Sequence, residues 1–189
     1  MKIEAPEDGL GCQSVYRVLG VLQADLNFYL ENTDVERDNF EFEGLMVGSG
    51  ALAVHADRRN VQYSTDTKDV DIYTNQEIAD LQDFESFPHT TRSRKDGSQL
   101  CYDTTSASTS VRPPEAFVDV ITDYTNAFDW DEDEATEIET LLEEETGDET
   151  ISDGIIAVYL PSLDTLEKTF EYSNRDYTER IEMIDQLRE

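Results

Sequence analysis

Two aspartates separated by one residue, Asp69 and Asp71, are the residues whose types and spacing most directly suggest chemistry. Polar and apolar residues alternate from Asp69 to Tyr73, which predicts a β-strand with both carboxylates on one face, about 7 Å apart. Mg²⁺ binds carboxylate oxygens together with substrate phosphates, and phosphoryl or nucleotidyl transfer uses such a pair with a third acid. In so acidic a chain, an isolated pair of this kind is most often a solvated strand face.

A glycine-rich turn precedes this pair. Leu45-Met46-Val47 predicts a short buried strand, Gly48-Ser49-Gly50 interrupts it, and 51–56 predicts a helix capped by Ser49. A strand, a Gly-Ser turn and a helix N-terminus together provide backbone N–H groups and a positive dipole end for phosphate. A lone Gly-Ser-Gly is most often an ordinary turn, so its position ahead of the two aspartates carries the interpretation.

A third acid, Asp119, lies within the apolar run 116–121, which predicts another strand. The alternative is a helix that begins after Pro113-Pro114 and leaves Asp119 on the surface. Asp103, on a strand predicted at 99–103, is the second candidate for the third acid. No Lys or Arg has an obvious position between Asp69, Asp71 and Asp119.

The remaining elements follow from hydrophobic periodicity and turn residues. Helices are predicted at 14–31 with Ser14 as the N-cap, at 75–87, within 129–149 with Ile138, Leu141 and Leu142 inward, at 163–170 after Pro161-Ser162, and at 176–188. A further strand is predicted at 155–159, with loops at 34–39, 60–68, 89–96 and 104–110. The fold class is therefore α/β or α+β, a small mixed sheet with flanking helices.

The order of these motifs resembles the signature of the polymerase-β-like nucleotidyltransferase superfamily. That signature is an apolar residue, Gly, Gly or Ser, a short helix, and then Asp-apolar-Asp, which Leu45–His55 and Asp69–Ile72 match. The Ala51-Leu52-Ala53-Val54-His55 segment is similar to the minimal AbiEii-type, type IV toxin-like branch. Phe117–Thr122 resembles the third strand of the family, and Val158–Leu166 resembles its closing strand and following helix. The loop 60–66 makes the spacing longer than is usual in this branch.

The resemblance implies a residue-by-residue assignment. Gly48 and Ser49 would hold the phosphates of a nucleoside triphosphate, and Asp69, Asp71 and Asp119 would bind Mg²⁺ or Mn²⁺. Lys168 falls where the branch carries a lysine that faces the nucleotide, although it equally fits a surface helix position. The same resemblance implies transfer of a nucleoside monophosphate to a hydroxyl of RNA such as tRNA, or of protein, and a toxin with a cognate antitoxin. The alternative is an inactive binding or regulatory protein of the same fold.

The resemblance also implies one nucleotidyltransferase-like domain, 1–189. It divides into an N-terminal helix at 1–35, a catalytic core at 40–125, and an acidic helix, closing strand and C-terminal helices at 126–189. Arg58 and Arg59 either contact the triphosphate or offset local acid, and His55 is expected on a helix face rather than as a base.

Charge is the outlying property of the composition. The chain has 44 Asp and Glu against 14 Lys and Arg, a formal net charge of -30, with the acids spread along its length. This resembles proteins from organisms that accumulate salt in the cytoplasm, where molar salt screens the repulsion. A nucleic-acid decoy would instead concentrate its acids on one face. No basic stripe is visible, so DNA is not an expected partner.

The expected location is the cytoplasm. The N-terminus lacks the apolar segment of a signal peptide, and no apolar run approaches the roughly 20 residues of a membrane span. Cys12 and Cys101 have no metal-ligand spacing and fit ordinary reduced cysteines.

Overall fold

The computed structural model describes residues 11–63, 68–76, 81–92, 99–104, 116–123, 132–145, 149–152, 154–172 and 175–189. The strands are β1 (Phe42–Val47), β2 (Asp69–Tyr73), β3 (Thr90–Arg92), β4 (Gln99–Asp103), β5 (Phe117–Ile121), β6 (Glu149–Ser152) and β7 (Ile156–Leu160). The helices are α1 (Cys12–Glu31), α2 (Gly48–Arg58), α3 (Gln82–Ser86), α5 (Glu132–Glu144), α6 (Leu163–Glu171) and α7 (Thr178–Arg188), with a 3₁₀ turn, η1, at Arg37–Asn39.

The strands form one mixed seven-stranded sheet in the order β3-β4-β5-β2-β1-β7-β6. Strands β1 and β2 at its centre are antiparallel, and each has a parallel neighbour on its other side, β7 for β1 and β5 for β2. Consequently the C-terminal end of β1 and the N-terminal ends of β2 and β5 lie side by side, at the same end of these three strands. The predicted α+β class, a mixed sheet with flanking helices, is confirmed.

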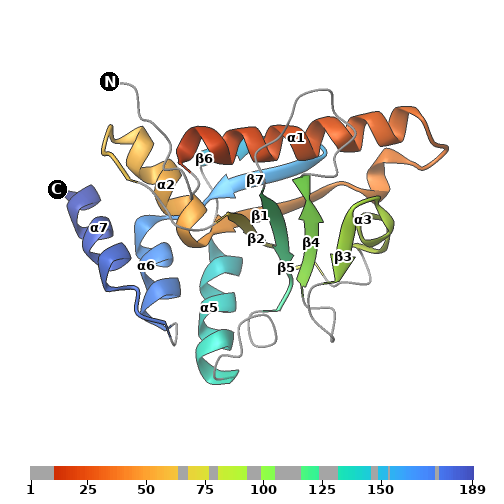
Figure 1. Cartoon of the computed structure of the whole chain (residues 1–189). Helices are drawn as coiled ribbons and strands as arrows, with labels where there is room; N and C mark the ends of the chain where they lie inside the picture. Colours follow the sequence, from red (N-terminus) through yellow and green to blue (C-terminus); the bar gives the residue numbers. More distant parts are fainter. Residues whose placement is uncertain are drawn as a thin grey trace.

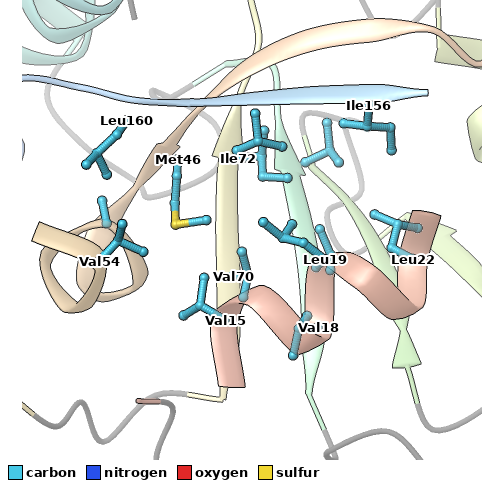
Figure 2. Close-up of a cluster of buried hydrophobic side chains, with 14 of the residues drawn as sticks. Val15, Val18, Leu19, Leu22, Met46, Val54, Val70, Ile72, Ile156 and Leu160 are labelled. Atoms are coloured by element: carbon cyan, nitrogen blue, oxygen red, sulfur yellow. The ribbon is translucent and has the colours of Figure 1, made fainter. Parts of the chain in front are cut away.

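Helix α1 lies across one face of the sheet (Figure 1). Its apolar residues recur every three or four positions, which gives it one buried stripe. Figure 2 shows side chains of this stripe against those of the strands and of α2. The labelled residues are Val15, Val18, Leu19 and Leu22 of α1, Val54 of α2, and Met46, Val70, Ile72, Ile156 and Leu160 of the strands. Because Val70 and Ile72 of β2 point toward α1, the alternate residues of β2 point to the opposite face.

The opposite face is covered in part by α5, which Figure 1 shows on the other side of the sheet from α1. A second apolar cluster forms there; its buried members are Leu45, Val47, Tyr73, Ile121, Ala135, Ile138 and Leu142. Tyr73 and Ile121 are the last residues of β2 and β5. Helix α5 therefore covers the C-terminal ends of these strands, and the acids lie within the first three positions of each strand.

Helix α2 packs against the C-terminal helices α6 and α7, beside which it stands in Figure 1. Buried His55 joins these elements, because its Nε2 lies 2.8 Å from Pro161 O and its Nδ1 lies 3.1 Å from Arg59 Nη1. Burial is the main cause that lowers the pKa of His55 to about 4, so the ring is neutral and donates from Nε2. The helix predicted after Pro161-Ser162 is α6, and Ser162 caps it by accepting from Thr165 N at 3.2 Å.

Several boundaries predicted from local pattern are wrong. Ser14 does not cap α1, which begins at Cys12 after Gly11 without a side-chain cap. Ser49 does not cap α2, because that helix begins at Gly48 and places Ser49, buried, in its first turn. A helix was predicted at 75–87, but Asn75 is not helical. In this range the described α-helix is α3, and residues 77–80 lie outside the described part.

Tertiary pairing explains two further differences. Part of the loop predicted at 89–96 forms β3, which pairs with β4. The alternative helix over Asp119 is excluded, because β5 pairs with both β2 and β4.

Leu141, expected inward, is only partly buried on α5. The predicted loop residues 64–67 and 105–110 lie outside the described residues, and none of the described helices is long and apolar enough to span a membrane.

Candidate functional site

The three predicted aspartates lie on one face of the sheet. In the parallel pair of β2 and β5, Asp71 is the register partner of Asp119, and Asp69 is the partner of Phe117. Register partners on neighbouring strands point to the same face, as do residues two apart on one strand. This face is the one opposite α1, because the alternate positions fill the core beneath that helix; they are Val70, Ile72, Val118 and Val120. We refer to Asp69, Asp71 and Asp119 as the carboxylate cluster.

Gly48, where β1 passes into α2, lies against this cluster. Val47 is the partner of Asp71 in the antiparallel pair of β1 and β2. The φ angle of Gly48 is 65°, and a Cβ at this position would lie 2.8 Å from Asp71 Oδ2. Glycine alone meets both the left-handed backbone and the close approach. As in any α-helix, the first-turn N–H groups of α2 have no intrahelical partners, and the residue before the helix does not cap them with its side chain.

Burial and mutual repulsion raise the pKa values of the cluster. Burial is the largest cause for Asp71, followed by the charges of Asp119 and Asp69, and its pKa rises to about 8. Burial, with a further contribution from Asp69, raises the pKa of Asp119 to about 6. Burial also raises the pKa of Asp69. Without a bound cation the cluster therefore retains a proton near neutral pH, and a cation that stabilised the ionised carboxylates would release it.

Asp119 has the most unusual surroundings of the three. It is 9% exposed, and its Oδ1 accepts no hydrogen bond from any described residue. Cys101 and Gln99 of β4 donate hydrogen bonds to the same carboxylate and oppose the rise in its pKa. Burial, together with the charge of Asp119, raises the pKa of the Cys101 thiol, so this thiol is a donor. A buried carboxylate oxygen without a donor is a position where a cation or a protonated ligand atom is expected.

Two arginines that the sequence analysis did not assign to the site act on the carboxylate cluster. The guanidinium groups of Arg175 and Arg180 oppose the rise in the pKa of Asp71. The Arg180 guanidinium stacks on the Tyr177 ring at 4.2 Å and lies 5.7 Å from the Phe170 ring. Both arginines act on Asp71 from the C-terminal part of the chain. No local signal marks these arginines, because they lie far from β2 in the chain and act on Asp71 only once the chain has folded.

The other candidate residues lie at varied distances from the cluster. Asp103 shares its face, but it pairs with Phe117 on β5 and stands one strand further from Asp71 than Asp119 does. Lys168 is exposed on α6, where its Nζ lies 2.7 Å from Glu171 Oε2, and no described aspartate of the cluster pairs with it. Arg58 donates to Thr150 O at 3.2 Å from the C-terminal end of α2, at the opposite end from Gly48.

The donor chemistry of the cluster fits a hard divalent cation. Among the described residues, no three His, Cys, Asp or Glu side chains are arranged as a set that could hold a metal ion. The three carboxylates nevertheless share one face, repel one another, and include one buried oxygen without a donor. Oxygen ligands of this kind are those that Mg²⁺ and Mn²⁺ take in proteins. The residues that would hold such an ion are Asp69, Asp71 and Asp119.

Comparison with known proteins gives no assignment: no protein-family model, no curated protein and no solved structure matches the chain.

Proposed function

We propose that the protein is a nucleotidyltransferase that moves a nucleoside monophosphate from a nucleoside triphosphate to a hydroxyl of RNA, such as tRNA, or of protein. One observation carries the proposal: Asp71 and Asp119 are register partners, and Gly48 at the start of α2 approaches Asp71. A carboxylate pair beside free helix N–H groups suits a ligand that contains both a divalent cation and phosphates.

Each group then has a role set by its chemistry. The first-turn N–H groups at Gly48 and Ser49 bind the β- and γ-phosphates, and Arg175 and Arg180 offset the charge of the triphosphate. Mg²⁺ or Mn²⁺, when bound by the three aspartates, supplies positive charge for the oxygens that become negative during transfer. Lys168 is retained as a proposed nucleotide contact, which requires that it leave Glu171.

The proposed reaction is an in-line displacement. The acceptor oxygen forms a bond to the α-phosphorus, the bond from the α-phosphorus to the bridging oxygen breaks, and pyrophosphate leaves. The proton of the acceptor hydroxyl passes to solvent water, because Asp119 Oδ1 is assigned to the cation.

The test is transfer of label from each of the α-labelled nucleoside triphosphates to cellular RNA or protein, in molar KCl with Mg²⁺. Asp71→Asn should reduce transfer by at least about 10³-fold, because positioning and charge stabilisation are both lost. Asp38→Asn, which removes an exposed acid from η1, is the matched control and should keep wild-type activity. Full activity in Asp71→Asn would overturn the proposal.

Calorimetric titration with Mg²⁺ and each triphosphate measures binding, and together with the transfer assay it distinguishes an active enzyme from the inactive binding protein. Binding without any transfer would indicate a regulatory protein of the same fold. Absence of binding to every triphosphate would remove both functions.

A further inference from the structure

Cys101 is one of the two cysteines of the chain, and it lies on the same face of the sheet as the carboxylate cluster. On β4, Leu100 and Tyr102 point into the core beneath α1. Gln99 and Cys101 therefore point to the opposite face. In the antiparallel pair of β4 and β5, Cys101 is the direct partner of Asp119.

The carboxylate of Asp119 accepts hydrogen bonds unevenly. Cys101 and Gln99 both donate hydrogen bonds to it. Oδ1 nevertheless accepts no hydrogen bond from the described residues, although Asp119 is more than nine-tenths buried. A donor that restrains a carboxylate also decides where its remaining lone pairs point, because rotation about χ2 would break the bond.

We infer that Cys101 is a positioning residue for Asp119: its S–H holds the carboxylate so that Oδ1 stays available to a divalent cation. The inference rests on the proposed function, because that function requires the cation at the carboxylate cluster. It adds one residue, Cys101 of β4, to the proposed site. This residue lies outside both the Gly-Ser turn and the Asp-x-Asp strand.

The size of the effect follows from the behaviour of ligand-orienting hydrogen bonds. Loss of a group that orients a metal ligand typically costs 10–100-fold in metal affinity. A thiol is a weak donor, and Gln99 remains as a second donor, so the effect belongs at the lower end. We expect about a 10-fold weaker cation affinity when the thiol is removed.

The experiment measures binding of Mn²⁺ alone, with free Mn²⁺ followed by electron paramagnetic resonance, so it needs no nucleotide and no activity. The variants are Cys101→Ala, which removes the donor, and Cys101→Ser, which keeps a donor of similar size. Cys12→Ala is the matched control, since Cys12 is the other cysteine and lies at the start of α1. Asp119→Asn is the reference for loss of the ligand itself.

The expected result is an Mn²⁺ dissociation constant raised about 10-fold in Cys101→Ala, close to wild type in Cys101→Ser, and unchanged in Cys12→Ala. Wild-type affinity in Cys101→Ala together with lost affinity in Asp119→Asn would overturn the role of Cys101 and leave the proposed function intact. Equal weakening by Ala and Ser would also overturn it, because the thiol would then act by packing. An absence of Mn²⁺ binding in the wild type would remove both the inference and the proposed function.

A second measurement does not depend on the folding of Cys101→Ala. In the Cys12→Ala background Cys101 is the only thiol, and its alkylation rate can be followed with and without Mg²⁺. An ion at Asp119 should change the alkylation rate several-fold, because it binds the carboxylate that the thiol contacts. An unchanged rate at Mg²⁺ concentrations that stabilise the protein would contradict the inference.

Discussion

Replacing Asp71 by Asn should change the pH dependence of stability in a defined direction. Burial and the charges of Asp119 and Asp69 raise the pKa of Asp71 from 3.8 to about 8. An acid whose pKa is higher in the folded than in the unfolded state stabilises the protein while it is protonated. That contribution is present below the unfolded pKa and is lost as the pH rises toward the folded pKa. The metal-free wild type should therefore lose stability between about pH 4 and about pH 8.

The magnitude follows from the same shift. A rise of this size corresponds to roughly 5–6 kcal/mol of preference for the protonated carboxyl. The three acids share this repulsion and relax when they ionise, so we expect about half of it, roughly 2–3 kcal/mol, in a measured difference. Asn has nearly the shape of a protonated Asp and does not titrate. Asp71→Asn should therefore be more stable than wild type by this amount at about pH 8, and similar to it at about pH 4.

The assay is urea unfolding followed by circular dichroism, at constant molar KCl, without divalent cations, across this pH range. Asp38→Asn removes one exposed negative charge and controls for general relief of the charge of -30. Parallel pH profiles for wild type and Asp71→Asn would refute the reasoning. An equal gain in Asp38→Asn would show that net charge, not the carboxylate cluster, causes the effect.

Three further perturbations have expected outcomes. At low salt, Mg²⁺ should raise the melting temperature of wild type more than Na⁺ does at equal ionic strength, and Asp119→Asn should lose that excess because the ion site is incomplete. Gly48→Ala should lower the free energy of unfolding in urea by about 1–2 kcal/mol, because the φ angle of 65° is unfavourable for Ala, and it should reduce nucleotide transfer. The control is Gly20→Ala on α1, where a Cβ meets nothing within 4 Å, and this change should be neutral or stabilising. Tyr102→Phe removes the 2.7 Å hydrogen bond from Tyr102 Oη to buried Asp25 Oδ2, and should lower the free energy of unfolding by about 1–3 kcal/mol without changing Mn²⁺ affinity.

Elements with a strong local period could be predicted from the sequence. The alternation from Asp69 to Tyr73 predicts β2 with its bounds, and the helical spacing from Val15 to Leu26 predicts α1. Such patterns reflect which side of an element is buried, and they need only neighbouring residues. The start of α6 was predictable for the same reason, because Pro161-Ser162 ahead of an apolar pattern is a local start signal.

Local reasoning failed where pairing between distant segments decided the conformation. Thr90 and its neighbours are polar, yet they form β3 because the exposed edge of β4 supplies their hydrogen-bond partners. Helix α2 begins at Gly48 rather than after Ser49, because the left-handed Gly48 lets the chain turn against Asp71. Tertiary contacts of this kind override local propensity.

The sequence by itself determined which residue types were present for the proposed phosphate and metal site. It supplied the Gly-Ser turn, two aspartates on one face of a strand, and a formal net charge of -30. Only the tertiary structure decided which groups meet them. The parallel pairing of β2 with β5 makes Asp119 the partner of Asp71, and the antiparallel pairing of β4 with β5 brings Cys101 to Asp119. Helix α7 brings Arg180 to act on Asp71 from a distant part of the chain. The physical reason is that strand order and helix docking are set by burial of the whole core, which no local pattern of residues records.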